Sequence, residues 1–151
     1  MDSSGIERAG MAWKRIAGYS LALLIGSSAV GFACGLFSSD DTADAARIEA
    51  IGMAATFAVY LAVFTRMAAG SAVRPIASAA WAAFVATALS LVLLWAVSAA
   101  WPRVFFAPFD ALDIAVDVAL LALAATFGVG LGSYLRDRRR ASSTAASRSA
   151  R

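Results

Sequence analysis

The sequence contains no histidine and only one cysteine, and charged residues make up 15% of its 151 positions. Without histidine, the common zinc sites, haem held by an imidazole and His-based acid–base or triad chemistry are excluded. Cys34 has no second cysteine with which to form an internal disulfide, and no activating neighbour is visible beside it. These absences predict no metal, no cofactor and no enzymatic activity.

Apolar residues are abundant instead, at 61% of the chain. An ordinary soluble domain is about 45–50% apolar and about 25% charged. A soluble protein of this length would need more charge to cover its surface, so the composition excludes a disordered chain, a soluble α/β enzyme and a disulfide scaffold. It favours a chain that lies mostly in lipid, and we therefore expect the lipid bilayer as its main partner.

Four long apolar runs account for this composition. A bilayer core of about 30 Å is crossed by about 20 helical residues, and the runs show none of the alternation typical of strands. The second run is the shortest, so we expect Tyr60 and Phe64 to lie at a membrane interface. We predict an all-α integral membrane protein, a four-helix transmembrane bundle over residues 16–135, with helices at 16–37, 48–65, 76–101 and 114–135.

The distribution of Lys and Arg predicts the orientation of this bundle. If the N-terminus lies inside, all basic residues except Arg47 and Arg103 fall on the inner side, in keeping with the positive-inside rule. We therefore predict a protein of the cell inner membrane with both termini cytoplasmic, a cytoplasmic segment 1–15 and a disordered basic tail 136–151. Most acids fall on the outer side: Asp40, Asp41, Asp44, Glu49, Asp110, Asp113 and Asp117.

Two other interpretations of the charges are less favoured. The net charge of +3 is the sum of a positive inner side and a negative outer side of the predicted bundle, and it is not a single basic surface. We therefore expect no nucleic-acid partner. Lys14 and Arg15 before an apolar run also resemble a signal peptide. The run is longer than a typical signal core of about 7–15 residues, and bulky Phe32 stands where cleavage needs a small residue. We therefore expect an uncut first helix.

Small residues recur every four positions in two of the predicted helices, and residues four apart share one helix face. Such faces let helices approach closely in lipid. They can pack within one bundle, or they can join copies of the chain or a membrane-protein partner. We expect packing within the bundle, with the first helix against the fourth. The residues concerned are Ser27, Gly31 and Gly35 in the first helix, and Ala124, Gly128 and Gly132 in the fourth.

Asp117 lies about one turn inside the fourth apolar run, on the same predicted face as Asp110 and Asp113. A charge at the bilayer centre costs about 2.5–3.5 kcal/mol, so an acid within a span is a functional candidate. Asp117 could carry a proton or bind a cation, with Arg47 or Arg103 as counter-charge. Alternatively, it reaches the interface or pairs with Arg103 for structural reasons. Glu49 lies at the matching level of the second helix and has the same two interpretations.

The acidic segment Asp40-Asp41-Thr42-Ala43-Asp44 matches the DDxxD pattern of prenyl-transferring enzymes, but a second acidic motif is missing. We interpret it as the capped start of the second helix. Two functional hypotheses remain. The chain is a non-catalytic accessory or self-associating helix-packing subunit, or it is a small oligomeric proton- or cation-coupled transporter or channel that uses Asp117.

Overall fold

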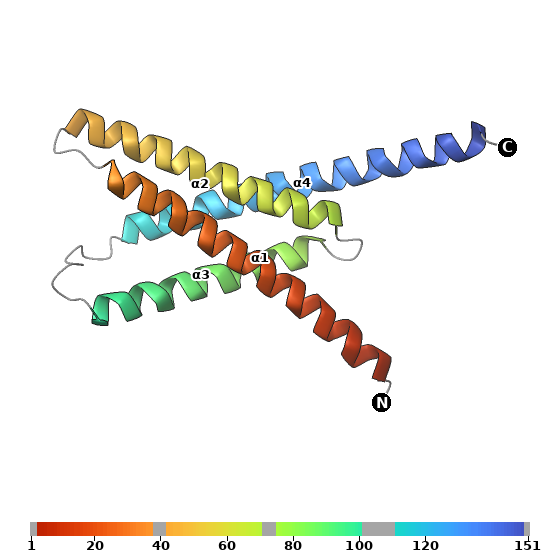
Figure 1. Ribbon diagram of the computed structural model, residues 1–151, viewed down its shortest axis with the longest axis horizontal. Helices are drawn as coiled ribbons and strands as arrows, with labels where there is room; N and C mark the ends of the chain where they lie inside the picture. Colours follow the sequence, from red (N-terminus) through yellow and green to blue (C-terminus); the bar gives the residue numbers. More distant parts are fainter. Residues whose placement is uncertain (1–2, 38–41, 71–74, 101–110, 150–151) are drawn as a thin grey trace.

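The computed structural model describes residues 3–37, 42–70, 75–100 and 111–149, with side chains described between Trp13 and Ser142. The described residues form four helices: α1 (Ser3–Leu36), α2 (Thr42–Gly70), α3 (Pro75–Ala100) and α4 (Ala111–Ser149). In Figure 1 the helices run along one long direction and cross near the middle, and the first part of α1 and the last part of α4 diverge towards the end where both chain termini lie. The predicted all-helical fold with four long apolar helices is confirmed.

Each helix is long and apolar enough to cross a membrane. The candidate spans contain 24 to 31 residues, and the most apolar 18-residue stretch of each has a mean hydropathy between 1.6 and 2.2. Only 11% to 22% of the most apolar part of each helix is buried inside the protein, so most apolar side chains point away from the bundle. The second half of α3 is the clearest case, because Leu91, Val92 and Trp95 are all exposed.

The two ends of the bundle carry opposite charge. The acidic end is formed by the last turns of α1 and α3 and the first turns of α2 and α4; the basic end is the opposite one (Figure 1). The charged residues described at the acidic end are Asp44, Arg47, Glu49, Asp113 and Asp117. Those at the basic end are Lys14, Arg15, Arg66, Arg136, Asp137, Arg138, Arg139 and Arg140.

The closest helix pair is α2 and α4, while α1 packs against α2 and α3. Gly128 and Gly132 permit this approach: a Cβ built at Gly132 would lie 2.5 Å from the Thr65 carbonyl oxygen and 2.7 Å from the Ala68 Cβ. The predicted packing of the first helix against the fourth is wrong for the described residues, which include no packed α1–α4 pair. A Cβ at Gly31 would meet no atom within 4 Å, so this glycine supports no close helix contact.

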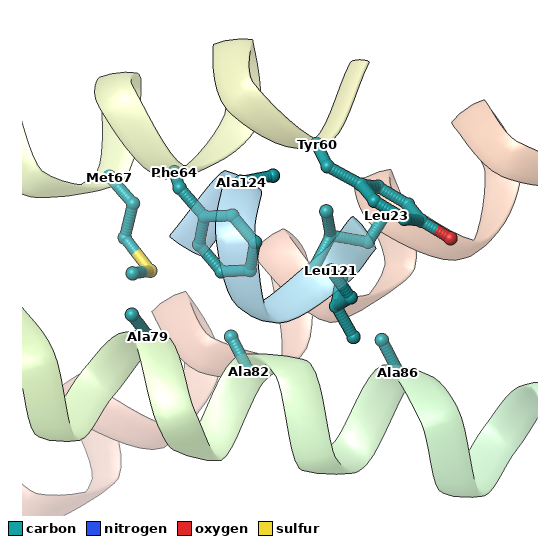
Figure 2. Close-up of a cluster of buried hydrophobic side chains, with 9 residues drawn as sticks. All are labelled: Leu23, Tyr60, Phe64, Met67, Ala79, Ala82, Ala86, Leu121 and Ala124. Carbon is teal, nitrogen blue, oxygen red and sulfur yellow. The ribbon is translucent and has the colours of Figure 1, made fainter. Parts of the chain in front are cut away.

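Nine buried side chains from all four helices form the apolar cluster: Leu23, Tyr60, Phe64, Met67, Ala79, Ala82, Ala86, Leu121 and Ala124. Figure 2 shows the three alanines of α3 pointing towards the larger side chains of α2. Tyr60 and Phe64 are 4% and 0% exposed, so the expectation that they lie at an interface is wrong. Their rings fill the space that the small α3 side chains leave open.

Three helices extend beyond their predicted ends. Helix α1 begins at Ser3 rather than residue 16, and α2 continues to Gly70 rather than residue 65. Helix α2 begins at Thr42 rather than residue 48, with Asp44 in its first turn and an ion pair of 3.7 Å between Asp44 and Arg47 three residues on. Both features stabilise a helix N-terminus. Helix α4 continues to Ser149, where a disordered tail was predicted. The tail is rich in Ala and Arg, which are strong helix formers, and the Ser142 hydroxyl donates to the Arg138 carbonyl at 2.9 Å.

A candidate cation site at the acidic end

The acidic end contains a cavity of about 630 Å³ between α1, α2 and α4, which Ser90 of α3 also lines. We call it the acidic cavity. Its carboxylates come from two helices, Glu49 from α2 and Asp113 and Asp117 from α4. Asp113 and Asp117 are four residues apart and therefore share a helix face, as the sequence predicted. The remaining polar lining consists of Ser27, Ser28, Cys34, Thr56, Tyr60 and Ser90.

Tyr60 positions Asp117. Its ring is buried in the apolar cluster, and Figure 2 shows its hydroxyl pointing away from Phe64 and Met67. That hydroxyl donates a hydrogen bond of 3.2 Å to Oδ1 of Asp117, and Ser27 of α1 lines the same cavity beside them. A buried tyrosine normally finds a polar partner. The result is a polar group of three side chains, from α1, α2 and α4, beside the cavity.

The acidic cavity ends against the apolar cluster. A smaller void of about 20 Å³ lies next to it, lined by Asp117, Tyr60, Ser27, Thr87 and Ser90 together with apolar side chains. A void needs about 10–15 Å³ and two to four polar partners to hold a water molecule, so this one is large and polar enough. Leu23 and Leu121 of the cluster also line it, and they separate it from the basic end.

The lining of the acidic cavity carries charge of one sign, because its described residues include three carboxylates and no Lys or Arg. Of the two counter-charges proposed from sequence, Arg47 pairs with Asp44 and lies outside this lining. Arg103 falls outside the described residues. Asp117 and Glu49 are both exposed at the cavity, where water or a cation can reach them. The cavity therefore attracts positive charge.

Among the described residues, the geometry does not favour a multivalent metal ion. Across the described parts of the chain, no three His, Cys, Asp or Glu side chains come close enough together to hold one. Multivalent ions such as Ca²⁺ need six or more oxygen ligands. Proton exchange at Asp117, or loose binding of a monovalent or organic cation among carboxylates and hydroxyls, requires fewer ligands.

The small residues that the sequence proposed for helix packing lie in different parts of the structure. Ala124, Gly128 and Gly132 lie buried on the α4 face that packs against α2. Ser27 and Gly31 line the acidic cavity, whereas Gly35 does not. Sequence reasoning missed Tyr60 and Cys34 as cavity residues. The available signal was a tyrosine in the middle of an apolar span, whose hydroxyl needs a partner in another helix.

Comparisons with known proteins identify no relative: no family model, curated protein or solved structure matches this chain.

Proposed function

We propose that this chain is a small membrane transporter or channel that takes up a proton or a cation at Asp117 in the acidic cavity. In this proposal the four helices cross the cell inner membrane, both termini lie in the cytoplasm, and the acidic cavity opens to the outer side. The observation that carries it is that Asp117, bonded to buried Tyr60, lines a cavity whose described lining has no basic residue.

Electrostatics support cation uptake. A cation about 4 Å from a carboxylate gains about 4 kcal/mol at the effective dielectric constant of about 20 that applies near a protein surface. A cleft that carries one sign of charge also raises the local concentration of counter-ions. Acids within transmembrane segments that face a water-filled cavity commonly mark ion and proton pathways. Asp117 fits this pattern, because it lies within a candidate span and lines a cavity.

The shape of the bundle supports transport rather than binding alone. The acidic cavity lies at one end of the bundle and is open to the surface, and the apolar cluster lies between it and the other end. A transport step would require this cluster to loosen, and α3 contributes only three small alanine side chains to it. The cavity and the cluster therefore provide a binding site and a barrier in series.

The test is a flux measurement in liposomes that contain the full chain, with an internal pH-sensitive dye to report protons and, in parallel samples, a potassium-sensitive dye to report a monovalent cation. We expect an imposed membrane potential to drive proton or cation movement faster than in empty liposomes. The variant Asp117→Asn should abolish this movement, because asparagine keeps the size and accepts the Tyr60 hydrogen bond but carries no charge. Tyr60→Phe should reduce it, because the carboxylate loses its positioning partner.

Asp44→Asn is the matched control. Asp44 is an exposed acid at the same end, it pairs with Arg47, and it does not line the acidic cavity. Its variant should transport like the unmodified chain. The proposal is wrong if liposomes with the unmodified chain behave like empty ones, or if Asp117→Asn transports normally while inserting at the same level.

A second candidate, a self-associating or accessory helix-packing subunit, is favoured by one observation. Leu91, Val92 and Trp95 on the second half of α3 are exposed, and this half of α3 contributes nothing to the apolar cluster. In this alternative, the surface would pack against another copy or another membrane protein. Cross-linking of the chain in native membranes at position 92, compared with position 76 at the other end of α3, would detect such a contact.

A further inference from the structure

Arginines from three helices surround the last two turns of α2 at the basic end. Arg66 of α2 lines two adjoining cavities, one of about 580 Å³ shared with Arg15 of α1 and one of about 890 Å³ shared with Arg139 of α4. Tyr19 and Gly70 also line both. Neither cavity has an Asp or Glu among its described lining residues. An anion would stabilise this concentration of positive charge.

The larger cavity has a charged part and an apolar part. Arg66 and Arg139 lie towards the basic end, while Ala58, Leu61, Ala62 and Leu131 continue the lining along α2 and α4 towards the middle of the bundle. The α2 residues that line it run from Ala58 to Gly70, about 18 Å along the helix at 1.5 Å per residue. That length is close to one leaflet of a hydrocarbon core of about 30 Å.

We propose that this cavity, the α2–α4 lipid site, binds one anionic phospholipid, with its phosphate held by Arg66 and Arg139. One acyl chain lies over the apolar lining. Arginine suits the phosphate because its guanidinium donates two parallel hydrogen bonds to phosphate oxygens. Basic pockets between transmembrane helices bind anionic head groups in the same way. The proposal rests on membrane insertion, but it is independent of cation uptake at the acidic cavity.

Binding is measured on the purified full chain in a neutral detergent, by native mass spectrometry and by the midpoint of thermal unfolding. The probes are phosphatidylglycerol and phosphatidylcholine with identical acyl chains. We expect one phosphatidylglycerol to remain bound and to raise the unfolding midpoint, and phosphatidylcholine to do neither. Equal binding of the two lipids would overturn the proposal.

Charge variants localise the head group. Arg66→Gln and Arg139→Gln should each weaken phosphatidylglycerol binding about fivefold, as expected for the loss of one arginine beside an anionic lipid. Arg138→Gln removes the same charge from the neighbouring position, which does not line the cavity, and should leave binding unchanged. A loss with Arg138→Gln equal to that of the other two would indicate attraction by net charge alone and overturn the site.

A size variant localises the acyl chain and separates a lipid from a free phosphate compound. Ala62→Trp should block the apolar part and abolish phosphatidylglycerol binding, whereas Ala54→Trp, at an exposed α2 position outside the cavity, should not. Glycerol phosphate, which has the charge but no acyl chains, should not raise the unfolding midpoint. Two results would contradict the lipid proposal and assign the arginines to a soluble phosphate. One is a rise in the unfolding midpoint with glycerol phosphate equal to that with phosphatidylglycerol, and the other is normal phosphatidylglycerol binding by Ala62→Trp.

Discussion

Replacing Gly132 with alanine should separate the two most closely packed helices. The new Cβ would lie 2.5 Å from the Thr65 carbonyl oxygen, 2.7 Å from the Ala68 Cβ and 3.0 Å from the Ala69 nitrogen. Carbon atoms pack best at about 3.5–4.0 Å, so the shortfall at Ala68 is about 1 Å. Two of these three neighbours are backbone atoms of α2, which cannot rotate away, so α2 and α4 must move apart as units.

The expected cost is about 1–3 kcal/mol in the free energy of unfolding, the usual range for overpacking. Gly130→Ala is the matched control on the same helix, because a Cβ there meets no atom within 4 Å. It should stabilise the helix by about 0.5–1 kcal/mol through the higher helix propensity of alanine. The two variants should therefore differ by about 1.5–4 kcal/mol, with Gly132→Ala the less stable.

The assay is unfolding of the purified chain in mixed micelles with increasing denaturing detergent, followed by the fluorescence of its tryptophans. A separation of 1.4 kcal/mol is tenfold in the unfolding equilibrium, so the expected difference is well resolved. If Gly132→Ala proves as stable as Gly130→Ala, the close α2–α4 contact is refuted.

Three further predictions concern single positions. The Thr65 hydroxyl is buried and has no hydrogen-bond partner among the described residues. Thr65→Val should therefore leave the free energy of unfolding unchanged or raise it by about 1 kcal/mol. A clear loss of stability in the same micelle assay would contradict this. The Ser20 hydroxyl joins α1 to α3 by donating a hydrogen bond of 3.1 Å to the Ala82 carbonyl. Ser20→Ala should therefore lower the free energy of unfolding by about 0.6 kcal/mol. An unchanged free energy of unfolding would argue against this contact. A phosphatase active only outside the cytoplasm should be inactive when fused at Gly70 and active at Ser39, and activity at Gly70 would reverse the proposed orientation.

The existence of the four helices could be predicted from sequence because the signal is local. Each apolar run contains enough residues to cross a bilayer, and the length of a run depends on no other part of the chain. The ends of the helices were less predictable. Asp44 in the first turn of α2 favours the longer helix through the helix dipole, and this effect does not appear in a hydrophobicity pattern.

The partner of each helix face could not be predicted in the same way. A small residue every four positions shows that a face allows close approach, but it does not specify the helix that approaches. Gly128 and Gly132 meet α2 rather than α1, and the depth of Tyr60 and Phe64 in the bundle follows from that contact. The bond between Tyr60 and Asp117 joins residues 57 positions apart, so it depends on the same helix arrangement.

The central claim is that the cavity around Asp117 is filled with water and attracts cations, and Cys34 provides a direct measurement of it. Cys34 lines this cavity and is the only cysteine in the chain. Its reaction rates with a positively and a negatively charged thiosulfonate reagent are compared in intact membranes, each normalised to the rate with a small free thiol. A cleft lined by charges of one sign accelerates association with counter-ions by about tenfold or more. The cationic reagent should therefore react at least about tenfold faster than the anionic one.

Asp117→Asn and Glu49→Gln should each reduce this preference, and Asp44→Asn should leave it intact. Equal rates for the two reagents with the unmodified chain, or no reaction with either, would contradict a cation-attracting aqueous cavity at Asp117.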